Sequence, residues 1–478
     1  MLTFPHAKKT YSYKGGTNLA ELYPLTPAQL FHHLPIRQLG MRCINVSAVC
    51  ALRVPLDFGL LKKCIQLEFE RNECMRVRFT KADAEGNVQQ YIVDQHTADI
   101  PYKDLSGMTM EACNALMQEW AFEEFADGDV PTCEITMVKL PEGYQGMFVH
   151  IDHRIADSCG MIVIINDLMQ LYSHYRFGSD MPEDLSSFKT MLEKDLAKEA
   201  NEKRVAKDAS FWEEQLEKLG EPLYSDIQGP KVLKESRDRH GDKTLRAADL
   251  ELADATVGVK DFELEADATQ HLMDFCLNHQ ISMTNLLLLG LRTYLSKCCG
   301  GQEDITVNNF ISRRSTHAEW TSGGTRTVSF PCRTVISPDT EFLDAVYEVQ
   351  DVQNHVYMHS NYSTLRLAKQ YQDRFGTPED TTYASMSLTY QPTPVSISNP
   401  HLSGIPIWNN WFTNGINTKK VYLTVSHRPD GGMHFSFHYQ TAHLDDHDME
   451  LTYYYLMRIL FRGIAEPDMP IGEIIAEL

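Results

Sequence analysis

A histidine and an aspartate four positions apart, His153 and Asp157, follow a short apolar strand and directly precede an apolar run of helical length. A neutral imidazole can take a proton from an attacking amine or hydroxyl near neutral pH, because its ordinary pKa is about 6.5. An aspartate in the same turn can fix the surroundings of that base. The spacing therefore predicts an acid–base site in a strand-to-helix turn. The same two residues also fit a solvated loop histidine and a helix N-cap, a role that Ser158 fills equally well.

Other patterns beside this turn allow different chemistry. His150 and Asp152 point to one side of the strand and, with a distant third histidine, mimic a two-histidine, one-carboxylate metal site; a paired core histidine is the competing interpretation. Cys159 is a conceivable thiol nucleophile, or a small apolar residue at the start of a buried helix. The sequence has no Walker A loop, no GxSxG elbow and no zinc-like cysteine spacing, and we expect no metal.

The composition restricts the class of protein. Hydrophobic residues make up 43% of the 478 residues, which is enough for a sizeable core and for two or three domains or lobes. The net charge of −21 argues against non-specific binding to nucleic acid or to anionic membranes. Eleven cysteines without a CxxC pair favour reduced thiols in a cytoplasm. No signal peptide or membrane span is evident, so we expect a soluble cytoplasmic protein.

Strands and helices alternate on both sides of the turn, which predicts a two-lobed α/β fold. Thr26 can cap a helix with Pro27 at its first position, and the apolar run at 283–298 predicts a buried helix. Pro429-Asp430-Gly431-Gly432 predicts a hairpin turn. We expect an N-terminal arm at 1–20, an N-terminal lobe with the His153/Asp157 motif at 21–188, a connecting helix and linker at 189–257, and a C-terminal lobe at 258–478.

Five segments together resemble the conserved blocks of condensation domains from nonribosomal peptide synthetases. They are, in chain order, YPLTPAQ at 23–29, ERNECMRVRF at 70–79, DHRIADS at 152–158, ASFWEEQL at 209–216, and the helix, turn and strand at 281–313. The third block is similar to the HHxxxDG active-site motif of that family. The resemblance covers nearly the whole chain in the expected order.

The resemblance implies two chloramphenicol-acetyltransferase-like lobes in a V shape, with a tunnel between them. It also implies acyl transfer from a pantetheine thioester to an amine or a hydroxyl. His153 takes the place of the catalytic histidine and Asp157 that of the supporting aspartate. Arg313 takes the place of the arginine that pairs with it. Such a partner is needed because a buried carboxylate without one costs several kcal/mol.

Two departures from the motif lead to further expectations. Asp152 stands where the family has its first histidine, and Ser158 stands where it has glycine. A carboxylate beside His153 is expected to favour the charged imidazolium and so weaken the base. Serine in place of glycine puts the geometry of the turn in question, since glycine reaches backbone conformations that serine avoids.

We therefore expect a free-standing acyltransferase that forms an amide or an ester and binds no cofactor permanently. Acyl-CoA or an acyl-phosphopantetheine carrier protein would be the co-substrate, and a small-molecule amine or alcohol the acceptor. We expect a monomer that binds neither nucleic acid nor membrane. The alternative is a catalytically degenerate condensation-like module that recruits partners. A third interpretation, hydrolysis or epimerisation of a tethered substrate, keeps His153 but needs a second group that the sequence does not identify.

Overall fold

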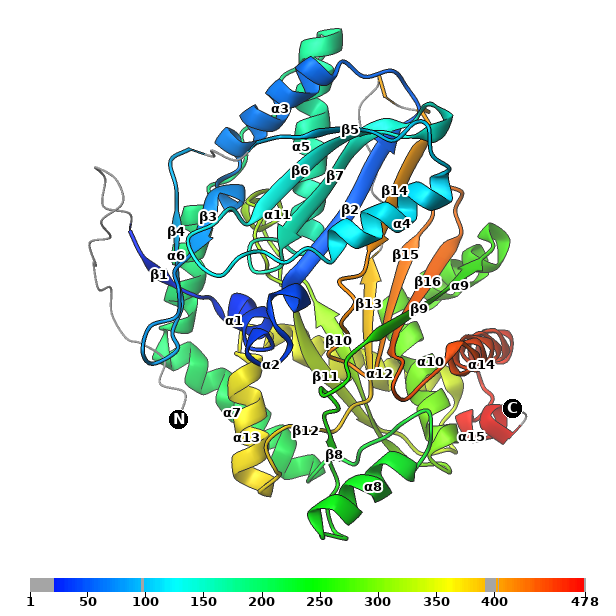
Figure 1. The fold of residues 1–478 in the computed structure, drawn as a ribbon. Helices are drawn as coiled ribbons and strands as arrows, with labels where there is room; N and C mark the ends of the chain where they lie inside the picture. Colours follow the sequence, from blue (N-terminus) through cyan, green and yellow to red (C-terminus); the bar gives the residue numbers. More distant parts are fainter. Residues whose placement is uncertain (1–20, 96–98, 392–400, 403, 477–478) are drawn as a thin grey trace. The chain divides into compact units, whose positions relative to one another are not determined.

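The computed structural model describes residues 21–95, 99–391, 401–402 and 404–476 (Figure 1). The arm predicted at 1–20 lies outside these residues. The chain forms two compact units. Unit 1 comprises Met1–Glu202, Arg314–Thr327 and Val395–Ile416, and unit 2 comprises Lys203–Arg313, Val328–Pro394 and Asn417–Leu478. The units interleave along the chain, whereas the lobe boundaries expected from the sequence, 21–188 and 258–478, are contiguous.

Unit 1 is built around a five-stranded sheet of order β14-β2-β7-β6-β5. The strands are β14 (Ile407–Phe412), β2 (Asn45–Leu52), β7 (Gln145–Asp152), β6 (Cys133–Lys139) and β5 (Tyr102–Asp104). β14 comes from far along the chain and pairs antiparallel with β2, which explains why 395–416 belongs to this unit. β7 lies in the middle of the sheet and is buried over almost its full length, so its end at Asp152 is held firmly.

Helices cover both faces of this sheet (Figure 1). α3 (Phe58–Arg71) and α5 (Ser158–Phe177) pack together and share an apolar core with Met147, Val149 and Ile151 of β7. The intervening Phe148 packs on the other side with Cys113 and Met117 of α4 (Met110–Ala121). Side chains alternate between the two faces of a strand, so β7 is apolar on both sides. The strand before the turn at 153–157 and the helix after it are therefore both anchored in core.

Glu68 of α3 is completely buried and lies beside Asp167 of α5. Arg71 donates two hydrogen bonds to Asp167, at 2.8 and 3.1 Å, and Asn72 donates one to Glu68 at 3.1 Å. Burial and the neighbouring Asp167 raise the pKa of Glu68 well above its usual value. In the folded protein this carboxyl therefore holds its proton at pH values where an exposed glutamate is ionised.

We predict that Glu68→Gln stabilises the protein at neutral pH. In the unfolded chain Glu68 ionises above about pH 4.3, while in the folded protein it stays protonated to higher pH. Its contribution to the free energy of unfolding therefore falls as the pH rises from about 4.3 toward its raised pKa in the folded protein. Glutamine keeps a neutral hydrogen-bonding group and removes this penalty. Melting temperatures of the two proteins should coincide near pH 4 and separate as the pH rises. The exposed Glu70→Gln on the same helix is the control; parallel curves for Glu68→Gln would contradict the prediction.

Unit 2 contains a six-stranded sheet of order β11-β10-β13-β15-β16-β9. The strands are β11 (Val328–Val335), β10 (Asp304–Ile311), β13 (Met386–Gln391), β15 (Val421–His427), β16 (Met433–Gln440) and β9 (Val257–Leu264). Its core joins this sheet to helices α9 (Ala266–His279), α10 (Met283–Cys298), α12 (Phe342–Met358), α14 (Asp446–Ala465) and α15 (Ile471–Ala476) (Figure 1). The helix predicted at 283–298 and the hairpin at 429–432 are confirmed.

Close packing in unit 2 depends on one glycine of α10. A Cβ built on Gly290 would lie 2.5 Å from a methyl of Leu456 and 2.9 Å from one of Leu460, both on α14. Any larger residue would force the side chains of Leu456 and Leu460, or the two helices, to shift, because packed interiors leave little spare volume.

The segment before β9 differs from its predicted form. The first part of this segment, up to Leu219, is rich in charged residues and forms two helices, α6 (Phe188–Glu199) and α7 (Glu202–Leu219). The rest of the segment at 189–257, which was predicted as a connecting helix and linker, contains α8 (Lys231–His240) and β8 (Ala248–Asp249). α8 and β8 contribute to a small apolar cluster of Tyr224, Val232, Leu233 and Ala248. Four apolar residues scattered among charges give no periodic signal, which is why the sequence pattern missed the order here.

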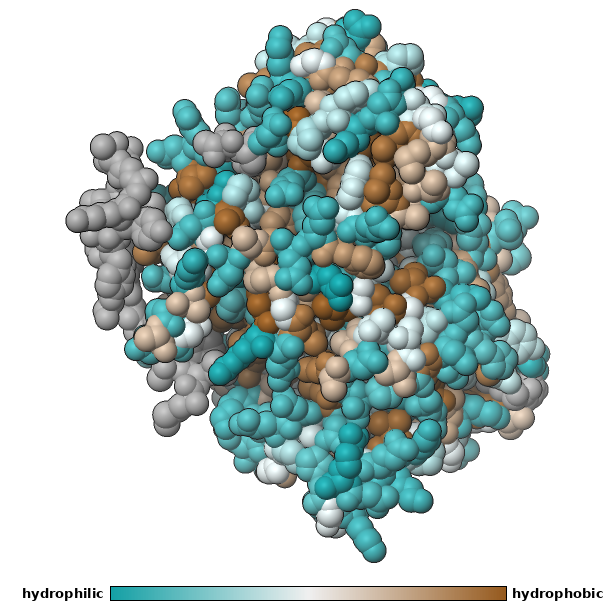
Figure 2. All heavy atoms as spheres, viewed as in Figure 1, coloured by the Kyte–Doolittle hydropathy of each residue, from teal (hydrophilic) through white to brown (hydrophobic). Residues whose placement is uncertain are grey.

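Hydrophilic residues predominate on the face of the molecule seen in Figure 2, as the net charge of −21 leads one to expect. Among the described residues, every helix is too short or too polar to cross a membrane.

Candidate functional site

The strand-to-helix turn predicted at 153–157 is present in unit 1. β7 ends at Asp152, and the backbone N–H of His153 donates to the carbonyl of Ile44 at 2.8 Å. Asp157 is the N-cap of α5, where its carboxylate accepts a hydrogen bond from the backbone N–H of Gly160 at 2.9 Å. The turn is thus fixed at its start by the sheet and at its end by a capped helix.

His153 is half-buried and lies between the end of the sheet and the start of α5. Its Nδ1 is buried and has no hydrogen-bond partner among the residues described. Burial lowers the pKa of His153 below its ordinary value, and the negative charge of Asp157 opposes part of this effect. Asp152 also raises the pKa of His153, as the sequence suggested, but burial outweighs both carboxylates, so the balance favours the neutral imidazole.

Asp157 is almost completely buried and its two oxygens accept six hydrogen bonds. Arg314 donates to both oxygens at 2.8 Å. The backbone N–H groups of Arg326 and Thr327 donate at 2.9 and 3.0 Å, and the Thr327 hydroxyl donates at 2.8 Å. Burial alone would raise the pKa of Asp157, but Arg314 and these hydrogen bonds outweigh it and hold the pKa well below its usual range. The carboxylate is a structural anchor that stays charged.

The arginine that pairs with Asp157 is Arg314, so the prediction of Arg313 for this role is wrong by one residue. β10 ends at Ile311, and Arg313 has φ +53°, a left-handed conformation that a regular strand does not contain. The alternation of side chains seen along the strand is broken there. After Arg313 the chain continues into the segment Arg314–Thr327 of unit 1, whose first residue, Arg314, bonds to Asp157.

Comparison with known proteins identifies the family. The sequence profile described as "Condensation domain" matches residues 19–476. The chain belongs to the condensation-domain family. Condensation domains are acyltransferases that form amide bonds in nonribosomal peptide synthesis, so the acyltransferase class and the family predicted from the sequence are confirmed.

The curated relatives are far longer than this chain. Surfactin synthase subunit 1 of Bacillus subtilis (strain 168) is 23% identical over 95% of the chain and 12% of its own length. Bacitracin synthase 3 of Bacillus licheniformis is 20% identical over 95% of the chain and 7% of its own length. The chain therefore spans a small part of each of these relatives.

Solved structures confirm the fold. The first condensation domain of the calcium-dependent antibiotic synthetase, in complex with substrate analogue 2a, is similar with a TM-score of 0.75 at 17% identity, over 95% of this chain and 98% of that one. The starter condensation domain of rhizomide synthetase RzmA, in complex with C8-CoA, gives a TM-score of 0.76 at 17% identity over 94% and 96%. These similarities support the mixed α/β, chloramphenicol-acetyltransferase-like fold.

This condensation domain compensates for the aspartate in place of the first motif histidine. Asp152 is fully buried, and Arg154 forms a two-pronged ion pair with it, with contacts of 2.6, 3.0 and 3.1 Å. The guanidinium of Arg154 also lies 3.9 Å above the ring of Phe79 and is 3.1 Å from Nδ1 of His33. Asp152 is therefore neutralised locally, which limits its pull on a proton at His153.

We predict that Asp152→His, which restores the family motif, destabilises this domain and gives no gain in rate. Arg154 would lose its buried carboxylate and remain as an uncompensated charge, at a cost of about 3–5 kcal/mol. Chemical denaturation and turnover of the single variant should both show the loss. The double variant Asp152→His with Arg154→Leu removes that charge and should regain stability. A single variant as stable as the parent would contradict the prediction.

Ser158 does not distort the turn of this condensation domain. It is the first residue of α5 and is absent from the described residues with positive φ, so no glycine-like conformation is required. The helix therefore starts regularly at Ser158, although the family has glycine at this position.

The two other candidate residues from the sequence, His150 and Cys159, have structural roles. His150 bonds to the Ser47 hydroxyl at 2.8 Å and stacks on Phe125, so it is the paired core histidine and not part of a metal site. Among the described residues, no group of three histidine, cysteine or acidic side chains is arranged to hold a metal ion. Cys159 is half-buried in the first turn of α5, the position expected of a small residue at the start of a helix.

Sequence reasoning missed the contribution of α1 (Pro27–His33). Its start follows the prediction, with Thr26 as N-cap and Pro27 in the first turn. Its last two residues reach the turn at 153–157: His32 stacks on His153, and His33 contacts Arg154. The tandem histidines at the end of a well-capped helix were the available signal, but their partners are far away in sequence.

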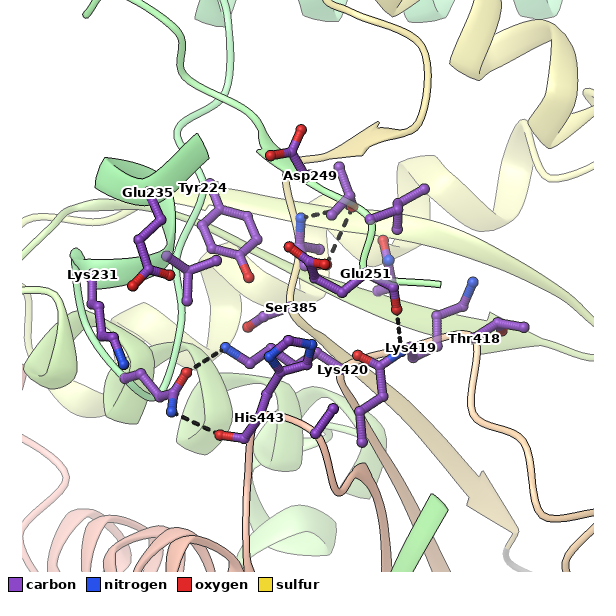
Figure 3. A pocket seen from close by; sticks show the side chains of 18 residues that line it. Tyr224, Lys231, Glu235, Asp249, Glu251, Ser385, Thr418, Lys419, Lys420 and His443 are labelled. Atoms are coloured by element: carbon purple, nitrogen blue, oxygen red, sulfur yellow. Dashed lines mark hydrogen bonds between the residues drawn. The ribbon is translucent and has the colours of Figure 1, made fainter. Parts of the chain in front are cut away.

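A separate pocket lies within unit 2 (Figure 3). Its wall contains Lys420, whose ammonium is 2.8 Å from the buried carboxylate of Asp226. Asp249 and Glu251 also line it, and both pair with Arg239, at 2.9 and 2.6 Å. These charges are compensated by neighbouring residues.

Proposed function

We propose that this domain forms an amide by moving an acyl or aminoacyl group from a pantetheine thioester to an amine, with His153 as the catalytic residue. The observation that supports it is a half-buried, neutral imidazole in a turn whose two flanking carboxylates are each neutralised by an arginine. Nδ1 of His153 is buried, so Nε2 is the nitrogen that can meet a substrate. Family membership supports this residue as the counterpart of the catalytic histidine.

The proposed step balances without any further reactant. The amine nitrogen attacks the thioester carbonyl, and the oxygen takes the carbonyl electron pair to form a tetrahedral intermediate. Nε2 of His153 accepts the amine proton as the C–N bond forms. When the intermediate collapses, the C–S bond breaks and the proton passes to the departing sulfur, which leaves as a thiol. A hydroxyl acceptor would follow the same course and give an ester.

The donor in this proposal is acyl-CoA or an acyl group on a carrier protein, which enters as a co-substrate. In support, a structural relative, the RzmA starter domain, is described in complex with C8-CoA and Leu-SNAC. The curated relatives are synthases of which this chain matches only a part, which supports a carrier protein as the other source of the donor.

The test is thiol release from a panel of acyl-CoA, acyl-pantetheine and carrier-bound donors, with mixed amine and alcohol acceptors. Release that requires both an acceptor and His153 supports amide or ester formation and identifies the substrates. Release without an acceptor indicates hydrolysis instead. The product mass distinguishes amide from ester.

A recruitment module is the second candidate, and the altered motif at Asp152 and Ser158 is the observation in its favour. It predicts binding of carrier proteins with no turnover on any donor, and the same affinity in wild type and His153→Ala. Acyl transfer that is lost with His153 rules it out.

A further inference from the structure

The imidazole of His32 lies face to face with that of His153. The ring centroids are 3.7 Å apart and the ring planes differ by 17°. His32 sits in the last turn of α1, whose start is fixed by a capping box between Thr26 and Gln29. One face of the proposed catalytic ring is therefore covered by a second titratable ring on a well-anchored helix.

The same helix also holds the residue after His153. Gln29 donates a hydrogen bond to the carbonyl of Arg154 at 3.1 Å, and Nη1 of Arg154 is 3.1 Å from Nδ1 of His33. Burial, together with Arg154, lowers the pKa of His33 to about 4, so its Nδ1 can accept that hydrogen bond. α1 therefore contacts His153 and its neighbour at three points, through Gln29, His32 and His33.

We propose that His32 is a positioning residue that holds the ring plane of His153 and opposes its protonation. The inference rests on the proposed function, because it concerns how His153 is kept ready as a base. Stacking removes the freedom of the ring to rotate away from the substrate. A proton on either ring also disfavours a proton on the other, since two cations would lie face to face.

The charged and titratable groups around His153 come from four segments. Asp152 at the end of β7 is paired with Arg154, Asp157 at the start of α5 is paired with Arg314 from 314–327, and the titratable ring of His32 on α1 stacks on His153. Each carboxylate is already paired with an arginine, so its pull on a proton at His153 is reduced. Besides burial, a proton on the stacked ring of His32 would act against a proton on His153.

The test compares His32→Ala with His32→Phe in the full chain. Alanine removes both the stacked ring and the titrating group, so we expect kcat to fall about tenfold with KM changed much less. Phenylalanine restores a stacked ring and should recover most of kcat. Its ring face attracts a cation, so the acid limb of the rate profile should move to higher pH. His355→Ala, which removes a histidine near Phe211 in unit 2, is the matched control.

A titration of the His153 imidazole by NMR, assigned by loss of its signal in His153→Ala, needs no substrate. It therefore tests the role of His32 even if no acyl transfer is found. A higher pKa for His153 in His32→Phe than in wild type supports the proposal. An unchanged pKa, or His32→Ala with kcat within twofold of wild type, overturns it. Loss of activity and melting temperature together in both variants would show a purely structural role and would also overturn it.

Discussion

His153→Ala is expected to reduce acyl transfer by about 10²- to 10⁴-fold while leaving the fold intact. The imidazole is the group that accepts the proton of the attacking amine in the proposed step, and alanine cannot take that proton. The ring is half-buried and its contact with His32 is a stacking interaction, so its removal should cost no more than about 1 kcal/mol of stability. Initial rates and thermal melting measured on the same preparation separate the two effects.

His150→Ala is the matched control for that experiment. His150 is on the same strand as the turn, is buried, and bonds to Ser47 and to the carbonyl of Glu123. Its loss should lower the melting temperature, because the Ser47 hydroxyl is left without this partner, while the folded fraction keeps its rate. Turnover near the wild-type rate in His153→Ala would contradict the assignment of His153 as the catalytic residue.

The sequence was informative where the local pattern determines the structure. His153 and Asp157 stand four residues apart in a turn that a strand precedes and a helix follows, and each of these elements is present. The Thr26 cap and the helix Met283–Cys298 were equally readable, since caps and apolar periodicity are local signals.

The parts that the sequence did not reveal depend on contacts between distant segments. A single left-handed residue, Arg313, moved the partner of Asp157 to Arg314. The positions of α1 beside the turn and of β14 beside β2 required the full fold, since neither leaves a periodic pattern. The sign of the pKa shift at His153 followed from its burial, which outweighs the charges of Asp157 and Asp152, and no spacing rule predicts that burial.

The Asp157–Arg314 ion pair is expected to make a large contribution to the stability of unit 1. Its side chains are only 2% and 1% exposed, so neither charge can be solvated when the other is removed. Arg314→Met leaves a buried carboxylate with backbone donors but no counter-charge, and Asp157→Ala leaves a buried guanidinium. Each should cost about 3–5 kcal/mol and lower the melting temperature by several degrees. Activity should fall with the loosened turn even below the melting range.

The neighbouring arginine is the control that separates the two positions. Arg313→Ala is expected to change stability much less than Arg314→Met, since the Asp157 oxygens bond to Arg314.

The contribution of the Asp157 carboxylate to stability also depends on pH. A carboxylate with a lowered pKa stabilises the fold above its unfolded pKa of about 3.9 and loses that effect as the pH falls. The difference between wild type and Asp157→Ala should therefore shrink in acid. Equal melting of Arg314→Met and wild type at pH 7 would show that the pair is not the anchor of the turn.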